Sequence, residues 1–300
     1  MTSAHRIRDW ALLAALTAMW GTSFMFIKLG VATVPPATLA ASRLVLGAVI
    51  LYVVMRSRGL KLPKPGRGWL PFAALAVIGN NVPFYVISWG QQYIDSALAG
   101  ILMAMMPLAT LLLAHFYVAG ERMTAYRALG FSLGFAGIVV LMGPAALAGL
   151  GGSLLMLTAQ AAVLGGALCY AANSVLVRRL VVTDFLVAST TVLIVSSVVS
   201  LPLAIVLDRP WELAPGMGST AAIVWLGVGP TALATLLYFT LVASAGPTFM
   251  SLVNYLTPVV ALLAGVTLLG EQPGTTAVAG LGFILLGIAL SRRRRAAGPA

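Results

Sequence analysis

The chain has 300 residues, of which 60% are hydrophobic and only 8% are charged, and its mean hydropathy is +1.02. Soluble domains carry charge on roughly a quarter of their residues, so this composition excludes an ordinary soluble protein and predicts an all-α integral membrane protein. The net charge of +11 does not indicate nucleic-acid binding, because the basic residues lie between hydrophobic runs. The single cysteine, Cys169, excludes an intrachain disulfide and a metal-binding thiolate cluster.

Apolar runs follow one another along the chain, each about as long as the ~20 residues that cross a bilayer as a helix. The first run follows Arg6 and Arg8, as in a secretory signal peptide, but it is too long and has no clear small-residue cleavage site, so we interpret it as a retained span. Continuous hydrophobicity, without the alternation of barrel strands, predicts helices. The ten predicted spans are 10–30, 35–56, 69–90, 96–118, 125–143, 154–177, 185–207, 219–241, 246–269 and 274–291.

Lysine and arginine residues are distributed very unequally between the two sides of the predicted spans. Fifteen lie at the termini and in the loops of one side, whereas the opposite loops contain only Arg209. Positively charged loops stay in the cytoplasm, so both termini are predicted to be cytoplasmic. Lys28 and Arg43 fall inside spans, in their extracellular halves, where either could meet a substrate carboxylate. We expect Lys28 to extend to the surface instead, and Arg43 to make structural hydrogen bonds.

The two halves of the chain share an ordered set of residues. An aromatic residue lies eight positions before a basic one in the first and sixth spans, and glycines lie 9 and 16 positions after a glutamate near the fifth and tenth. The matched pairs are Trp20 and Tyr170, Lys28 and Arg178, Pro107 and Pro258, Glu121 and Glu271, Gly130 and Gly280, and Gly137 and Gly287. Because each copy would contain five spans, an odd number, the second must enter the membrane with opposite polarity. The sequence therefore predicts two inverted five-helix repeats, residues 1–148 and 149–300, the second ending in a basic cytoplasmic tail; such repeats are typical of secondary transporters.

Polar and aromatic residues interrupt several apolar runs near their middles. Asn81, Tyr85, Ser88 and Gln92 share one predicted helical face in the third span. Amides are costly in hydrocarbon, so we expect this face to line a cavity, and interhelical hydrogen bonding is the alternative. Aromatic side chains on both halves would form the cavity walls, with simple packing as the alternative. The predicted substrate-binding residues are Trp20, Asn80, Asn81, Tyr85, Tyr170, Asn173, Tyr238, Asn254 and Tyr255.

Prolines and acidic residues bear on how such a carrier would work. Pro107 and Pro258 each remove a backbone donor from a span, which predicts hinges, with static kinks as the alternative. All seven acidic residues lie at span ends or in loops, so no mid-membrane carboxylate is available to couple transport to protons.

No set of catalytic residues or metal ligands can be assembled, which argues against a membrane enzyme and predicts no cofactor or metal. A passive channel is disfavoured by the repeat and the mid-span prolines.

The order of several motifs resembles the EamA-type drug/metabolite transporter family over nearly the whole chain. These motifs are Trp20-Gly21 with Lys28, Pro36 with Arg43, Pro107 with Glu121, and Pro258 with Leu269-Gly270-Glu271. The resemblance implies a ten-helix exporter of small metabolites with a cavity between two five-helix halves. Within the family, the chain is similar to the YddG-type exporters of amino acids, notably aromatic ones.

These observations predict a carrier of the bacterial inner membrane that exports small neutral amphipathic metabolites, above all amino acids, by alternating access. Facilitated diffusion or exchange is the expected mode. The alternative is a facilitator or flippase for another solute, such as a drug, a sugar or a lipid-linked metabolite. The predicted partners are a small-molecule substrate and the lipid bilayer, with no nucleic acid; a monomer is compatible with the sequence, which does not determine the oligomeric state.

Overall fold

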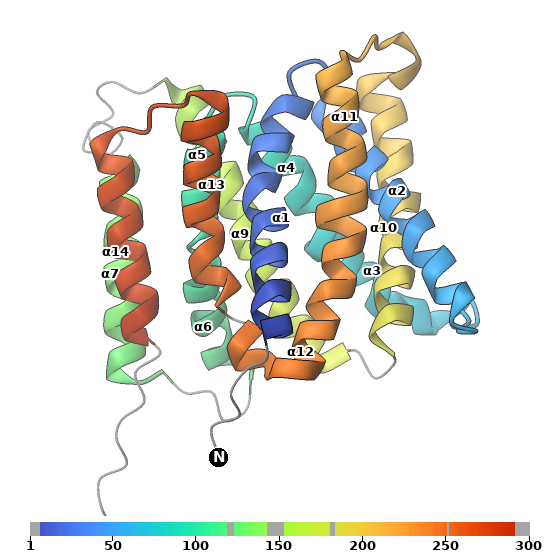
Figure 1. Ribbon diagram of the computed structural model, residues 1–300, viewed down its shortest axis with the longest axis horizontal. Helices are drawn as coiled ribbons and strands as arrows, with labels where there is room; N and C mark the ends of the chain where they lie inside the picture. Colours follow the sequence, from blue (N-terminus) through green and yellow to red (C-terminus); the bar gives the residue numbers. More distant parts are fainter. Residues whose placement is uncertain (1–6, 119–122, 143–152, 181–183, 251, 292–300) are drawn as a thin grey trace, which may run out of the picture.

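The computed structural model describes residues 7–118, 123–142, 153–180, 184–250 and 252–291, so Glu121 of the predicted repeat lies outside the described residues. Within these ranges the chain contains helices and turns and no strand, and its long helices lie side by side (Figure 1). Seven helical segments are long and apolar enough to cross a membrane, and shorter apolar helices cover 256–269 and 275–290. The prediction of an all-α membrane protein is therefore confirmed.

The first half begins with two uninterrupted helices, α1 (Ile7–Gly30) and α2 (Pro36–Ser57). The third predicted span is composite: it consists of a 3-10 turn, η1 (Arg67–Trp69), followed by α3 (Leu70–Ala76), a π-helical segment, η2 (Val77–Asn81), and α4 (Val82–Gly90). The fourth is divided into α5 (Ser96–Met103) and α6 (Met106–Tyr117), and the fifth is α7 (Ala125–Met142). Pro36 and Pro107 lie in first helical turns, where a missing N–H costs no helical hydrogen bond.

The second half follows the same order of elements. Its helices are α9 (Leu154–Leu180), α10 (Phe185–Asp208), α11 (Met217–Leu226), α12 (Ala234–Met250), α13 (Val253–Leu269) and α14 (Thr275–Ser291). A 3-10 turn, η3 (Pro210–Glu212), precedes α11, and a second π-helical segment, η4 (Gly227–Leu233), joins α11 to α12. The sidechain carboxylate of Asp184 accepts hydrogen bonds from the first amides of α10, and Gly270, with φ 67°, ends α13.

The predicted boundary between the eighth and ninth spans coincides with a kink in the structure. The prediction ends the eighth span at 241 and begins the ninth at 246, and α12 is kinked at Gly246, whose φ of 83° is left-handed. The membrane-length apolar segment ends at Gly246, and α12 continues beyond the kink to Met250 before α13 begins at Val253.

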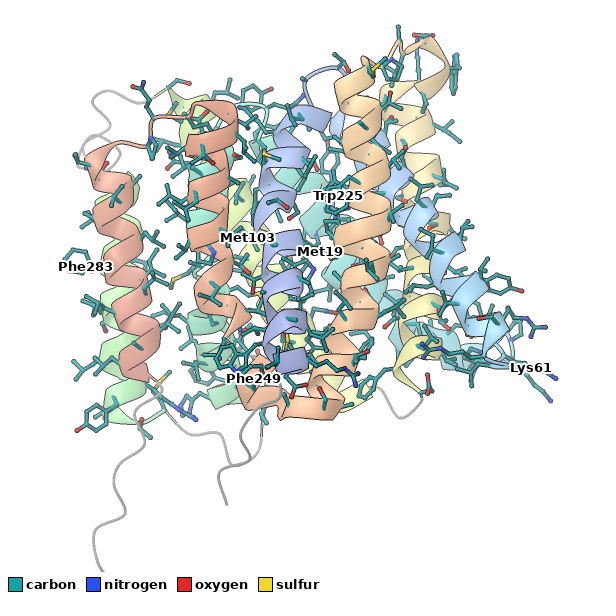
Figure 2. All side chains as sticks on the ribbon, in the orientation of Figure 1. Met19, Lys61, Met103, Trp225, Phe249 and Phe283 are labelled. Atoms are coloured by element: carbon teal, nitrogen blue, oxygen red, sulfur yellow. The ribbon has the colours of Figure 1, made fainter. Side chains whose placement is uncertain are left out.

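The glycines of the sequence repeat lie where α7 and α14 pack against each other, at one edge of the bundle (Figure 1). A Cβ atom on Gly137 would lie 2.8 Å from the carbonyl oxygen of Gly280, and one on Gly287 would collide with the backbone of Gly130 and Gly134. Each glycine therefore meets a glycine of the other sequence-matched pair: Gly137 lies against Gly280, and Gly287 lies against Gly130. On the outer face of α14, Phe283 projects away from the bundle (Figure 2).

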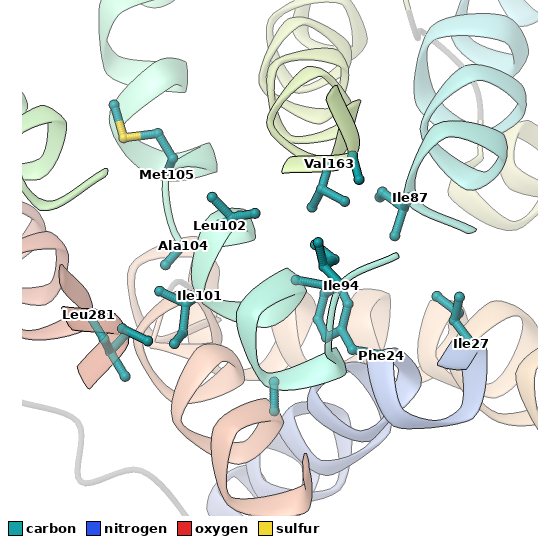
Figure 3. Close-up of a cluster of buried hydrophobic side chains, with 14 of the residues drawn as sticks. Phe24, Ile27, Ile87, Ile94, Ile101, Leu102, Ala104, Met105, Val163 and Leu281 are labelled. Atoms are coloured by element: carbon teal, nitrogen blue, oxygen red, sulfur yellow. The ribbon is translucent and has the colours of Figure 1, made fainter. Parts of the chain in front are cut away.

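The largest buried cluster lies where helices of both halves meet. It joins residues of α1, α4, α5, α9, α13 and α14, and Figure 3 shows Phe24, Ile94 and Val163 within it. Helices α4 and α9 pack in opposite directions: a Cβ on Gly90 would lie 2.8 Å from the carbonyl oxygen of Ala159, and one on Gly79 would lie 2.7 Å from the amide of Asn173. The two halves therefore pack so closely here that no side chain fits at Gly79 or Gly90.

Acidic side chains join helix ends of different halves. The Glu271 carboxylate, just after α13, accepts hydrogen bonds of 2.8 Å from the backbone amides of Ser96 and Ala97 at the start of α5. Asp208, at the end of α10, accepts a 2.6 Å hydrogen bond from the backbone amide of Thr38 in α2. Every acidic residue that the structure describes lies in a terminal turn of a helix or in a connection between helices, as predicted.

Candidate functional site

Two π-helical segments lie at corresponding places in the two halves. The segment η2 begins at Val77 and η4 begins at Gly227, which is the same separation of 150 residues as between Trp20 and Tyr170. A π-helical turn contains an extra residue and leaves backbone groups without their ordinary helical partners, and such turns occur frequently at functional sites. Each segment is contacted by the first two helices of the opposite half.

Around η4, the contacts come from α1 and α2. The indole Nε1 of Trp20 donates to the carbonyl oxygen of Pro230 at 3.3 Å, and the rings of Trp20 and Tyr238 lie 6.1 Å apart. Arg43 donates from Nε and Nη2 to the Thr231 hydroxyl, each at 3.2 Å. The Thr231 hydroxyl donates its own proton to the carbonyl oxygen of Leu226 at 2.7 Å, so its lone pairs remain for the arginine.

Around η2, the contacts come from α9 and α10. The amides of Asn80 and Asn81 donate to Ser196, the first to its hydroxyl at 3.0 Å and the second to its carbonyl oxygen at 2.8 Å. The amide of Asn173 packs directly on Gly79. The Oδ1 atoms of Asn81 and Asn173 are buried, and no described residue provides them with a hydrogen-bond donor. These are acceptors that a bound solute could satisfy.

The structure thus places several predicted site residues around the two π-helical segments, while others lie elsewhere. Tyr85 packs on Ala37, Ala41 and Ala204, between α2 and α10. Tyr170 packs against two of the buried clusters. Asn254 is half-buried on α13 without a hydrogen bond to any described residue, and the side chain of Tyr255 lies outside the described residues.

Comparison with known proteins identifies the family. The model of the EamA-like transporter family matches residues 9–143 and 157–293. The chain belongs to this family. The two matched segments contain one π-helical segment each, so the candidate site of this EamA-family transporter is built from both.

Relatives along nearly the full length are named as transporters. An uncharacterized transporter of Archaeoglobus fulgidus is 27% identical over 96% of this chain and 100% of its own length. The uncharacterized inner membrane transporter YedA of Escherichia coli is 26% identical over 93% of this chain and 88% of its own. A probable terminal-alkyne amino-acid exporter of Streptantibioticus cattleyicolor is 29% identical over 95% and 93%. A protein of known crystal structure has the same fold, with a TM-score of 0.67, 21% identity, and coverage of 96% of this chain and 97% of its own.

Sequence reasoning missed two residues of this EamA-family site, Ser196 and Thr231. Thr231 lies 150 residues after Asn81, so aligning the two halves through their third and eighth spans would have found it. Ser196 is one of several serines in α10, and nothing in its sequence context distinguishes it.

The two basic residues inside the spans differ in their surroundings. Lys28 donates from Nζ to the carbonyl oxygen of Ile94 at 2.8 Å, in the connection between α4 and α5. Arg43 makes the interhelical hydrogen bonds that the sequence analysis expected, and its guanidinium also lies over the ring of Phe84, 4.0 Å from the ring centre. One base is therefore held at the end of the bundle and the other between its halves.

Proposed function

We propose that this EamA-family transporter exports small amphipathic metabolites, above all amino acids, by alternating access. The observation that carries the proposal is the composition of the site around η2 and η4: it combines the aromatic pair Trp20 and Tyr238 with the unsatisfied amide acceptors of Asn81 and Asn173. Aromatic surface suits an apolar side chain, and amide oxygens suit an α-ammonium group. The S. cattleyicolor relative, named as a probable exporter of an amino acid, supports the same substrate class.

The proposed architecture is ten spans in two inverted repeats, residues 1–148 and 149–300, around this site. The two family matches and the equal spacing of the π-helical segments support it. The proposed hinges are Pro107, beside the break between α5 and α6, and Pro258, inside α13. Each would let its helix bend while one half of the carrier moves against the other around the site.

We propose that the protein lies in a bacterial inner membrane with both termini in the cytoplasm. The basic residues of the connection after α2, including Lys61 (Figure 2), lie at the end of the bundle where α1 begins, as the fifteen-to-one charge distribution requires. A reporter fused after Ala300 should be active if it works in the cytoplasm and inactive if it needs the periplasm. Activity of a periplasm-dependent reporter at this position would reverse the proposed orientation.

A flippase for a lipid-linked solute is the second candidate, and one observation favours it. An apolar groove of about 720 Å³ runs along the outer face of α11, with Met217, Val224 and Trp225 among its lining residues. A lipid chain could lie in such a groove while a polar head enters the bundle. This candidate predicts transport of a lipid-linked substrate in place of free amino acids.

The deciding experiment is counterflow of labelled amino acids in proteoliposomes of the purified protein, with no pH difference imposed. Aromatic and other apolar amino acids should exchange down their gradients. Trp20→Ala should weaken the apparent affinity by roughly 5- to 150-fold, because it removes the aromatic surface on which an apolar side chain would pack, a contact that contributes ~1 to 3 kcal/mol.

The matched control is Trp211→Ala, because Trp211 is 68% exposed and lies in η3, the short connection between α10 and α11. This variant should transport like the wild type. Absence of amino-acid counterflow in the wild type would contradict the proposed substrate class, and an equal loss in both tryptophan variants would contradict the proposed role of Trp20.

A further inference from the structure

Arg43 is a buried cation without an acidic partner. Its side chain is only 5% exposed, and no acidic residue that the structure describes forms an ion pair with it. The described carboxylates all lie toward the ends of helices, while Arg43 lies in the second turn of α2, between the two halves. Ionisable side chains inside membrane-spanning segments are expensive to bury, so an unpaired one indicates that its partner arrives from elsewhere.

The guanidinium is held on one edge and one face. Its first edge, formed by Nε and Nη2, donates to the Thr231 hydroxyl, and one face lies on the ring of Phe84. The end of the guanidinium, formed by Nη1 and Nη2, is here called the outer edge. No described residue accepts a hydrogen bond from Nη1. A guanidinium has five N–H groups, so three of them remain for another acceptor, and two of these point along the outer edge.

Close packing of α2 against η4 holds Arg43 beside Thr231. A Cβ atom on Gly47, one helical turn after Arg43, would lie 2.6 Å from the Thr231 side chain, so glycine at 47 lets α2 approach η4 closely. A hydroxyl and an aromatic ring compensate the arginine charge only in part, because neither carries a negative charge. A carboxylate matches the outer edge, since its two oxygens can accept parallel hydrogen bonds from Nη1 and Nη2.

The two residues that the guanidinium contacts are neighbours in sequence of other residues of the candidate site. Phe84 follows Asn81 by three positions, and Thr231 follows Pro230, whose carbonyl oxygen accepts from Trp20. Tyr170 on α9 packs against the buried cluster that contains Phe84, the ring on which the guanidinium lies. Arg43 therefore contacts both α4 and η4, which belong to different halves of the chain.

We propose that the outer edge of Arg43 binds the carboxylate of the transported solute, so that the transporter selects carboxylate-bearing metabolites over the corresponding amines and amides. This inference rests on the proposed function, because it assigns a role within the same site. It assigns the α-carboxylate to Arg43, and leaves the α-ammonium group to the amide oxygens of Asn81 and Asn173.

The test compares Arg43→Gln with the wild type on matched ligands. Binding of L-phenylalanine, L-phenylalaninamide and 3-phenylpropanoate to the purified protein in lipid nanodiscs is measured, with the melting temperature of each ligand-free variant as a check of folding. The wild type should bind both carboxylates more tightly than the amide. Arg43→Gln should weaken carboxylate binding roughly 10- to 100-fold and change amide binding little, because only a charge-assisted hydrogen-bonded pair is lost. Arg43→Lys should retain part of the affinity for carboxylates, since lysine keeps the positive charge but cannot donate two parallel hydrogen bonds.

The outcomes separate this inference from the proposed function. The wild type could bind 3-phenylpropanoate more tightly than the amide, in a way that depends on Arg43, and yet show no amino-acid counterflow. This result would support the inference and contradict the amino-acid proposal. Equal weakening of carboxylate and amide ligands by Arg43→Gln would overturn the inference and assign Arg43 a purely structural role. If Arg43→Gln fails to fold, the ligand series on the wild type and Arg43→Lys decides: a wild type that binds the amide as tightly as the carboxylates overturns the inference.

Discussion

Replacing Gly287 with leucine is expected to force α14 away from α7 and to lower the free energy of unfolding by about 3 kcal/mol. A side chain at this position has no space, because its Cβ would already collide with the carbonyl of Gly130 and would lie 2.8 Å from the backbone nitrogen of Gly134. Backbone atoms cannot rotate aside as the end of a side chain can. Helices in membranes associate largely through such close packing of small residues, so the substitution should weaken the packing of α7 against α14 along their whole contact.

Gly282→Leu is the matched control for this variant. Gly282 lies on the same helix, is exposed, and has no atom within 4 Å of the place where its Cβ would stand. Leucine there should be neutral or slightly stabilising, because glycine is a poorer helix former by about 1 kcal/mol. Thermal unfolding of the two purified variants in the same detergent provides the measurement, and similar melting temperatures for both would show that the glycine contact does not hold α7 against α14.

Replacing Glu271 with alanine should produce the second large loss, about 2 to 4 kcal/mol of unfolding free energy. Its carboxylate accepts three hydrogen bonds of 2.8 Å, from the backbone amide and hydroxyl of Ser96 and from the backbone amide of Ala97. These donors include the first amides of α5, which have no partners within their own helix, and hydrogen bonds to a charged acceptor contribute more than neutral ones. Glu271→Gln keeps one acceptor oxygen without the charge and should lose about half as much.

Glu212→Ala is the control for the glutamate series. Glu212 pairs with Arg209 at 3.6 Å, but the two side chains are 57% and 66% exposed, so their interaction contributes little to stability. At neutral pH we therefore expect the melting temperature of Glu271→Ala to be well below that of Glu271→Gln. The melting temperature of Glu212→Ala should be near that of the wild type. If the Glu271→Ala and Glu212→Ala proteins have the same melting temperature, this carboxylate does not hold the start of α5.

Composition and the lengths of the apolar runs predicted the membrane class and the approximate extent of most helices. About twenty consecutive apolar residues are needed to cross hydrocarbon, and the charges and prolines between the runs mark their ends, so α1 and α2 fall within a few residues of the predictions. The repeated glycines could also be found by comparing the halves. Their spacing could not reveal that Gly287 lies against Gly130, because spacing along one helix contains no information about the helix opposite.

The π-helical segments and the contacts across them depend on the packing of the helices and could not be predicted from the sequence. Hydrophobicity does not distinguish a π-helical from an α-helical turn, so the polar residues of 77–81 were visible but their backbone conformation was not. Helical periodicity correctly grouped Asn81 with Tyr85, yet these residues meet Ser196 and a row of alanines between α2 and α10. In a membrane, lipid and protein interior are both apolar, and the pattern of a single helix therefore cannot show which neighbour it faces. The pairing of Arg43 with Thr231, 188 residues apart, required the folded chain.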